Sequence, residues 1–438
     1  MKEIFLHHVW ESLLFDQNQL KTTCGKDIRI LKPGRPHHDA GPDFQLAILL
    51  IDGTKWAGDV EIHLSSADWH KHGHSTDSRY DQTILHVVYT NNGAPILRSD
   101  KTQIPCLELK PYISYEVLHK YAQLQNATNA IPCSFGLEQV PKLIWEGWTE
   151  RLAIDRLESK VERLKPKLAK LQNNWLSLLY WEIARCMGLT KNTVGFELLA
   201  KKIPLSIVLR QSNIEAVEAL FFGVSGLLPA HADSPYEKML HERFTHLQHK
   251  YAMETLDNSV WVFLRIRPHE FPTIRIAQLA HLARDIEAIF EACCYDTKLK
   301  DVMRLLQVQA SPFWETHFSF NNRTSPHTRQ LGTSKAQQLV SNAIIPVLFG
   351  YAQTLSNEAL SNKLVEWSHE LPPEKNNVTG LFASKALPNA NGFQSQGILQ
   401  LHQKFCTLKR CLECAVGHSI LKKKTDEKTI CKNMEVYH

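Results

Sequence analysis

The hydrophobic pattern of the chain changes near Val140, and this change limits the fold more than any other feature of the sequence. Before it, three apolar stretches, Phe44–Ile51, Lys55–Leu64 and Thr83–Thr90, have the length and β-branched content of strands. After it, apolar residues recur every three to five positions, as they do along one face of a helix. The pattern predicts an α+β fold, in which a small mixed sheet is followed by a mainly helical region.

The composition is that of a soluble globular protein with more than one domain. Of the 438 residues, 43% are hydrophobic and 22% are charged, and this length predicts two or three domains. We place them at residues 1–125, 140–256 and 257–438. No stretch approaches the ~18 apolar residues of a membrane helix, and charged residues and histidines interrupt the opening segment, where a signal peptide would be apolar. We expect a cytoplasmic protein without a membrane partner.

Two carboxylates are expected to meet at one end of a β-hairpin. The turn pair Asp52-Gly53 joins two of the apolar stretches, so that Asp43 and Glu61 lie near the same end of the sheet. Carboxylate oxygens are the ligands that magnesium and manganese prefer, and these two residues therefore predict a site for Mg²⁺ or Mn²⁺. His63 would lie beside Glu61, where it could orient water, bind phosphate or act as a base. The alternative is an aspartate that caps a turn and an exposed glutamate on an edge strand.

Histidines are concentrated in the segment that follows this hairpin. If the segment is helical, His70, His74 and Asp77 share one face that could bind zinc or manganese. Side chains of the same segment could also contact the phosphate oxygens of a substrate. The candidate substrate-binding residues are His70, His72, His74, Arg79, Tyr80 and His86. The alternative is a solvated loop that Trp69 anchors to the core.

Cysteines near the end of the chain form a second candidate metal site. Cys406, Cys411 and Cys414 are spaced closely enough to reach one ion, and His418 follows four residues later. These four residues would suit zinc. A distant cysteine as the fourth ligand would suit zinc or an iron–sulfur cluster. The candidates for that position are Cys24, Cys133 and Cys431. The alternative is that these cysteines pack into the apolar face of a helix.

A short basic and aromatic stretch in the helical region is a weaker candidate for contacts with nucleic acid. Arg265 and Arg267 are interleaved with aromatic residues between Trp261 and Phe271, and such a pattern can bind phosphates and stack on bases. The alternative is a rigid connector with two exposed arginines. The net charge of +5 neither requires nor excludes a nucleic-acid partner, and the sequence does not identify a protein partner.

The element order of residues 1–95, together with the Pro42–Asp43 pair and the Glu61–His63 segment, resembles the PD-(D/E)xK nuclease superfamily. The resemblance implies a restriction-endonuclease-like domain in which Asp43 and Glu61 bind the metal and Glu11 of the first helix adds a carboxylate. His63 stands where the superfamily usually has a catalytic lysine. Because histidine is shorter and largely neutral at physiological pH, a catalytically inactive domain is an alternative.

Nearly the whole chain also resembles an uncharacterised bacterial family, the domain of unknown function number 2851. The segments that carry this resemblance are Gly41–Phe44, Gly58–His63, Asp68–Trp69, His72, His74, Leu85–Val88, Arg265–Pro268 and Cys411–Cys414. We expect a metal-dependent nucleic-acid phosphodiesterase whose helical region clamps the substrate. One alternative is an inactive nuclease-fold protein that binds nucleic acid or a protein partner. The other is a zinc hydrolase that uses the histidine-rich segment.

Overall fold

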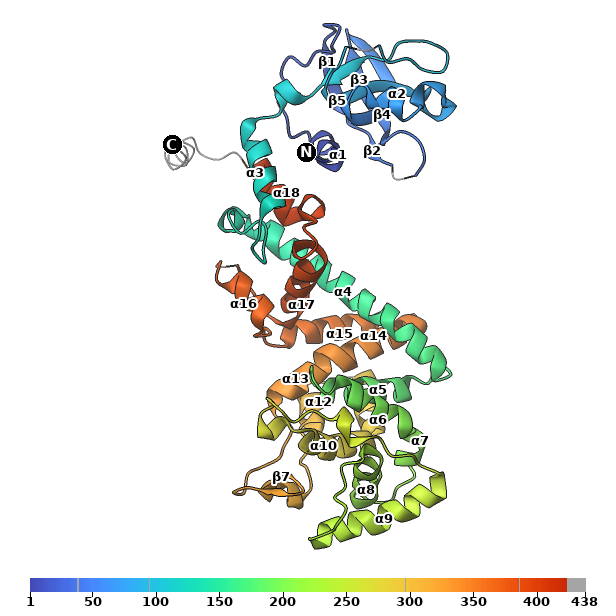
Figure 1. Cartoon of the computed structure of the whole chain (residues 1–438), viewed down its shortest axis with the longest axis vertical. Helices are drawn as coiled ribbons and strands as arrows, with labels where there is room; N and C mark the ends of the chain where they lie inside the picture. Colours follow the sequence, from blue (N-terminus) through green and yellow to red (C-terminus); the bar gives the residue numbers. More distant parts are fainter. Residues whose placement is uncertain (38, 94, 296, 386, 424–438) are drawn as a thin grey trace. The chain divides into compact units, whose positions relative to one another are not determined.

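The strands of the first part of the chain form one mixed sheet, in the order β1-β3-β4-β5-β6, with β2 also paired to β3. β3 and β4 are antiparallel, whereas β4 pairs with β5, and β5 with β6, in parallel. The strands are β1 (Ile28–Lys32), β2 (Arg35–Pro36), β3 (Phe44–Ile51), β4 (Thr54–Ser65), β5 (Thr83–Thr90) and β6 (Cys106–Glu108). They are drawn in blue and cyan in Figure 1, a view of the computed structural model. The structure describes residues 1–37, 39–93, 95–295, 297–385 and 387–423.

A tight turn fixes how β3 and β4 pair. Asp52 and Gly53 have φ values of 49° and 76°, so both lie in the left-handed region that a two-residue type I′ hairpin turn requires. The pairing runs from Ile51 opposite Thr54 to Phe44 opposite Val60. Asp43 comes just before Phe44, and Glu61 comes just after Val60. Because the two strands are antiparallel, both residues lie at the same end of the hairpin.

Helix α1 (Glu3–Glu11) packs against β4 (Figure 1). It buries Phe5, Val9 and Trp10, and the Trp10 indole donates a hydrogen bond to the carbonyl of Pro33 at 2.9 Å. This apolar face holds the helix on the sheet, and burial of each such large side chain contributes about 1.5–3 kcal/mol.

The remainder of the chain is mainly helical, which confirms the α+β prediction. The helices are α2 (Asp68–Lys71), α3 (Tyr115–Asn126), α4 (Lys142–Lys170), α5 (Trp175–Met187), α6 (Thr193–Lys202), α7 (Leu205–Val208), α8 (Ile214–Ser225), α9 (Pro235–Tyr251), α10 (Pro272–Arg284), α11 (Ile286–Cys294), α12 (Leu299–Leu306), α13 (Thr333–Leu339), α14 (Ile345–Thr354), α15 (Glu358–Glu370), α16 (Asn377–Ala383), α17 (Gly392–Leu401) and α18 (Ala415–Lys422). A two-stranded sheet is formed by β7 (His317–Ser319) and β8 (Asn322–Arg323).

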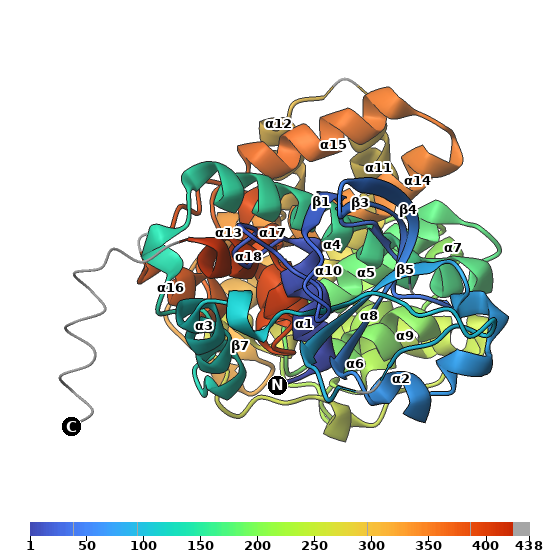
Figure 2. The same cartoon turned by 90° about the horizontal axis from the view of Figure 1, so that it is seen from above.

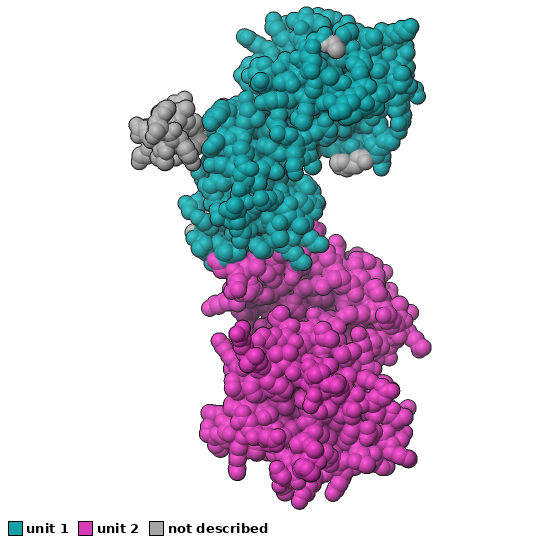
Figure 3. Space-filling view, viewed as in Figure 1, with its two compact units in different colours: residues 1–148, 381–387, 401–438 teal, residues 149–380, 388–400 magenta. Residues whose placement is uncertain are grey.

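The chain divides into two units, shown in teal and magenta in Figure 3. Unit 1 consists of residues 1–148, 381–387 and 401–438, and unit 2 of residues 149–380 and 388–400. The division differs from the three expected domains, because a single apolar core in unit 2 extends across residues 256 and 257.

Unit 2 is built around this core, whose largest fully buried side chains include Trp314, Tyr180 and Phe221. Within it, α8 and α9 lie side by side (Figures 1 and 2). A capping box between Ser234 and Glu237 fixes the start of α9. In the described ranges, no helix is long and apolar enough to cross a membrane.

Candidate metal site on the sheet

Asp43 and Glu61 lie together at the end of the β3–β4 hairpin. The backbone N–H of Asp43 donates to Glu61 Oε2 at 3.0 Å, and the backbone N–H of Ile62 donates to Asp43 Oδ2 at 2.9 Å. Burial, and then the negative charge of Glu61, raise the pKa of Asp43 to about 8. Two carboxylates this close, one buried and one half-buried, are unfavourable when both are charged unless a proton or a cation lies between them. The pair is therefore suited to a cation.

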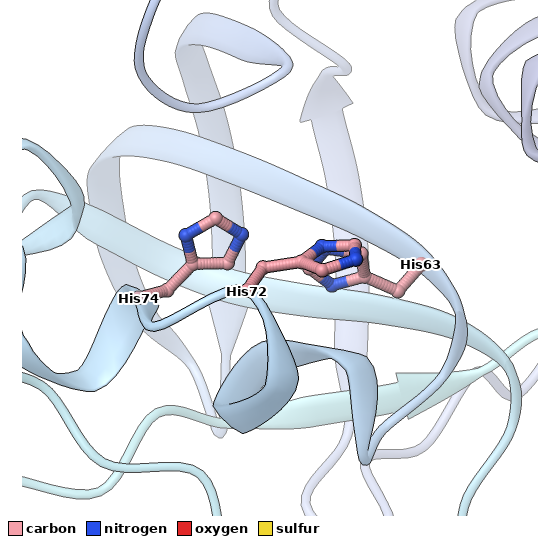
Figure 4. A group of neighbouring side chains, drawn as sticks. All are labelled: His63, His72 and His74. Carbon is pink, nitrogen blue, oxygen red and sulfur yellow. The ribbon is translucent and has the colours of Figure 1, made fainter.

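Three histidines lie together beside Glu61, and two of them contact its carboxylate. His63 projects from β4, whereas His72 and His74 belong to the segment that follows α2 (Figure 4). Glu61 Oε1 lies 3.4 Å from His63 Nε2 and 3.3 Å from His74 Nε2. His72 Nδ1 lies 3.1 Å from His63 Nε2. We call Asp43, Glu61, His63, His72 and His74 the histidine–carboxylate cluster.

These separations are those of ligands that share one ion. Two ligand atoms that are each about 2.1 Å from a metal lie about 3.0 Å apart at a right angle and about 3.4 Å apart at the tetrahedral angle. The distances from His63 Nε2 to His72 Nδ1 (3.1 Å) and to Glu61 Oε1 (3.4 Å), and from Glu61 Oε1 to His74 Nε2 (3.3 Å), fall in this range. In the part of the chain that the structure describes, these three histidines form the only group of three or more ligand atoms within 4.8 Å of one another.

The protonation of His63 also suits a metal, because only a neutral imidazole can be a ligand. Burial, and then the neighbouring histidines, lower the pKa of His63 to about 2. Burial lowers the pKa of His86 to about 3 in the same way. His86 lies on β5 beneath His63, with its Nε2 2.8 Å from His63 Nδ1. His86 therefore orients the His63 ring through the nitrogen that faces away from Glu61, as the outer partners of metal-binding histidines do.

The local fold explains why His72 and His74 reach the cluster. Trp69 is fully buried, and its indole donates to the carbonyl of Leu97 at 3.1 Å, so that α2 is anchored to the sheet. The helix ends after about one turn, and Gly73, with a φ of 77°, reverses the chain. His74 is thereby buried against Tyr80, with their ring centroids 3.8 Å apart.

Tyr80 and His86 thus lie at the cluster, whereas other candidates from the histidine-rich segment do not. His70 is exposed and turns to the carbonyl of Pro95, 3.0 Å away. Asp77 pairs with Arg79 on the surface. The predicted zinc set of His70, His74 and Asp77 is therefore wrong, because the segment is not one continuous helix and these side chains do not share a face.

The first helix contributes different residues from the one predicted. Glu11, the last residue of α1, is exposed. Glu3 and His7, one turn apart at the start of the helix, face the cluster. His7 Nε2 lies 3.4 Å from Asp43 Oδ2. Burial raises the pKa of Glu3, and the nearby charges of His72 and Glu61 lower and raise this pKa, respectively. Sequence reasoning missed these two residues, although their spacing by four positions was a signal that could have found them.

Residues 3–377 match the model of the family described as "Protein of unknown function (DUF2851)". The chain belongs to this family. The matched residues include the whole histidine–carboxylate cluster and end before Cys406. No curated protein and no solved structure matches the chain.

Arg265 and Arg267 lie in unit 2, on the segment before α10, and are both exposed. Arg265 has a φ of 58°, and its carbonyl accepts a hydrogen bond from Lys191 at 3.1 Å. Trp261 anchors this segment by donating to the carbonyl of Ser225 at 2.8 Å. The arrangement is that of an anchored connector with two solvent-facing arginines.

Unit 2 contains a basic cavity that the sequence did not indicate. The cavity has a volume of about 660 Å³, within the range of small-molecule sites. Its basic lining residues are Arg156, Lys160, Arg163, Lys167, Arg185 and Lys335, and its acidic ones are Glu182 and Glu197. Lys160 is buried, and its ammonium group donates to Gln396 Oε1 at 2.8 Å and to Asn342 Oδ1 at 3.0 Å. Burial lowers the pKa of Lys160 to about 7. The excess of basic groups favours an anionic ligand.

The predicted cysteines come together in unit 1 without the predicted histidine. Cys406, Cys411 and Cys414 line one small cavity with Cys133, and we call these four residues the cysteine cluster. Instead, Nδ1 of His418 lies 3.3 Å from His8 Nε2 and 3.3 Å from Ser12 Oγ. The assignment of His418 as the fourth ligand is therefore wrong. Two further cysteines had been candidates for that position. Cys24 is exposed, and Cys431 lies outside the described residues.

Proposed function

We propose that the chain is a metal-dependent phosphodiesterase that acts on nucleic acid, with one divalent ion bound by the histidine–carboxylate cluster. The observation that carries the proposal is the group of three histidine nitrogens, two of which lie 3.3 to 3.4 Å from Glu61, beside the carboxyl group of Asp43. Such an ion activates a bound water molecule and offsets the negative charge of a phosphodiester.

The ligand set favours manganese over magnesium. Magnesium prefers oxygen ligands and retains several waters, whereas imidazole nitrogen suits transition metals. Three imidazoles and two carboxylates form a mixed set, and manganese accepts both kinds of ligand. His63 is neutral and oriented by His86, so it serves as a ligand and does not supply the positive charge of a lysine.

Asp43 has a second task beside the ion. With a pKa of about 8 it holds a proton near neutral pH in the absence of a cation, and it can release this proton as a cation approaches. Its Oδ2 accepts the N–H of Ile62, which fixes the carboxyl group against β4. Glu61 is fixed in turn by the backbone N–H of Asp43, so backbone groups of the hairpin hold both carboxyl groups.

The basic cavity of unit 2 supports a polyanionic substrate. Lys160 donates to neutral amide and carbonyl oxygens, and Lys335 donates to the carbonyl of Cys186 at 2.6 Å. The cavity has more basic than acidic side chains in its lining, and such an excess attracts phosphate oxygens. This feature is consistent with the proposal that the helical region binds the substrate.

The test is cleavage of single- and double-stranded DNA and RNA by the full chain in the presence of manganese. Because Glu61 contacts two of the histidine ligands, we expect Glu61→Gln to lower cleavage at least ~100-fold, and Asp43→Asn to do the same. The control is His70→Ala, which removes a neighbouring histidine that points elsewhere. Equal cleavage by the wild type and both acidic-site variants contradicts the proposal. Retention of nucleic acid without any cleavage favours the inactive binding protein instead.

The three imidazoles also favour a second candidate function, a zinc hydrolase of small substrates. In this case His63, His72 and His74 bind zinc and Glu61 is the general base. Hydrolysis of p-nitrophenyl acetate by the zinc-loaded chain, lost in His74→Ala and without any cleavage of nucleic acid in manganese, would support this function over the first.

A further inference from the structure

Four buried cysteines from distant parts of the chain meet in unit 1. Cys133 lies between α3 and the short 3₁₀-helix Leu137–Gln139, whereas Cys406, Cys411 and Cys414 lie between α17 and α18. Each is only 5–7% exposed, and all four are free thiols. They line one cavity whose other walls are apolar, including Leu137, Phe382, Leu401 and Phe405.

The four thiols are close enough to affect one another. Burial has the largest effect on the pKa of Cys133 and raises it. The neighbouring thiols raise this pKa further, in the order Cys406, Cys414 and Cys411. Burial, and then Cys414, raise the pKa of Cys411 to about 11. The thiols are therefore protonated and inert without a metal, and a soft metal that binds them must displace their protons.

The sulfur of Cys414 receives hydrogen bonds that favour the thiolate. Cys414 is the N-cap of α18, and the backbone N–H groups of Val416 and Gly417 donate to its sulfur and lower its pKa against the effect of burial. The side chain of Trp148 acts in the same direction. A neutral thiol is a weak acceptor, whereas a metal-bound thiolate is tuned by such hydrogen bonds.

The backbone around the cluster is shaped so that its segments can approach closely. A Cβ atom on Gly417 would collide with the carbonyl oxygen of Cys411, and one on Gly136 would lie 2.8 Å from a methyl group of Ile420. Cys406 ends a π-helical turn, His402–Cys406, of a kind that often occurs at functional sites. Lys409, with a φ of 52°, reverses the chain between Cys406 and Cys411.

The spacing of the sulfurs indicates which metal they would bind. Four thiolates on a single zinc ion, each at about 2.3 Å, lie about 3.8 Å from one another. Within the described residues, however, the three histidines are the only group of three or more ligand atoms that all lie within 4.8 Å of one another. No three of the four sulfurs are therefore this close together. The sulfurs thus surround a wider space than one ion fills, and a four-iron cluster, which takes one thiolate on each iron, suits that arrangement.

We propose that Cys133, Cys406, Cys411 and Cys414 bind an iron–sulfur cluster that ties the segment 401–423 to the rest of unit 1. A preassembled cluster with two ferrous and two ferric ions takes up the four thiolates without any change in oxidation state, and the four thiol protons pass to solvent. The apolar walls exclude water from the cluster, as a structural role requires. This inference does not depend on the proposed nuclease function.

The test is metal analysis of the full chain after anaerobic purification and reconstitution with ferrous iron, ferric iron and sulfide. We expect about four irons and four sulfides per chain, broad visible absorbance and an electron paramagnetic resonance signal after reduction. Cys133→Ala and Cys411→Ala should each lose most of the iron. Two controls should keep it: Cys24→Ala, which removes an exposed thiol, and Cys293→Ala, which removes a buried thiol in unit 2.

Three results would overturn the inference. They are a wild-type chain that takes up no iron and sulfide, iron retained in full by Cys133→Ala, and one zinc ion per chain that Cys133→Ala loses. The wild-type measurement decides the matter even if a cysteine variant fails to fold. Circular dichroism of each variant separates loss of the cluster from loss of the fold.

Discussion

The histidine–carboxylate cluster and the cysteine cluster lie in the same unit but offer a metal opposite surroundings. The first combines oxygen and nitrogen atoms and includes the exposed His72, whereas every residue of the second is buried and supplies sulfur. Sites that are open to solvent can admit water and substrate, and closed sites with a full set of protein ligands are structural. The comparison teaches that one unit holds two groups of potential ligands that differ in both ligand type and exposure, and under the two proposals this difference would separate reactive from structural metal chemistry.

The largest expected effect separates the two clusters by chelation. Dialysis of the reconstituted chain against EDTA should remove the ion of the open cluster and lower nucleic-acid cleavage more than ~100-fold, because the activated water is lost with it. Addition of manganese should restore activity. Visible absorbance and iron content should stay unchanged throughout, because the thiolates are shielded. If iron and activity disappear together and manganese restores neither, the two clusters do not have separate tasks.

The next effect distinguishes His72 from His70, which stands two positions earlier. His72→Ala removes a nitrogen that lies 3.1 Å from His63 Nε2 and should weaken manganese binding about 10- to 100-fold. His70→Ala should leave the affinity unchanged, because its ring faces Pro95. Isothermal titration calorimetry of both variants measures the difference. Equal losses in the two variants would mean that the ion is not bound where the distances place it.

Much of the first cluster was predictable because its parts are close in sequence. The Asp52-Gly53 turn and the apolar alternation of β3 and β4 set the pairing that brings Asp43 beside Glu61. The choice of His72 over His70 was not predictable, since it depends on where α2 ends and on the left-handed conformation of Gly73. A helical pattern in a sequence indicates neither of these points with enough accuracy.

The second cluster was predictable only in part, for the opposite reason. The spacing of Cys406, Cys411 and Cys414 is a local signal, but Cys133 joins them through the tertiary fold. His418 was an attractive fourth ligand by its distance along the chain, yet α18 turns it toward His8. Partners that are distant along the chain leave no periodic pattern in a single sequence. The basic cavity of unit 2 was missed for the same reason, because several helices contribute to its lining.

The pH dependence of manganese binding further sharpens the comparison. Asp43 has a pKa of about 8 without metal, so below this pH the ion must displace its proton. Manganese affinity should therefore rise about tenfold per pH unit up to about pH 8 and then level off. The His63 ring, with a pKa lowered to about 2, adds nothing to this slope because it is already neutral. Titrations at about pH 6.5, 7.5 and 8.5 measure it.

The matched variant for this slope is Asp43→Asn, which cannot hold the proton. Its manganese affinity should be lower than that of the wild type at pH 8 and nearly independent of pH between about 6.5 and 8.5. An Asp43→Asn variant with the same slope as the wild type would show that another group supplies the proton.

The smallest expected effect concerns Arg79, which had been a candidate for substrate binding. Its guanidinium group pairs with Asp77 on the surface, with exposed side-chain fractions of 56% and 26%. Exposed pairs of this kind contribute little, because water and salt screen them. Arg79→Ala should therefore change manganese affinity and cleavage by less than about twofold at moderate salt. A loss as large as that of His72→Ala would place the substrate across this surface and extend the open cluster beyond the five residues assigned to it.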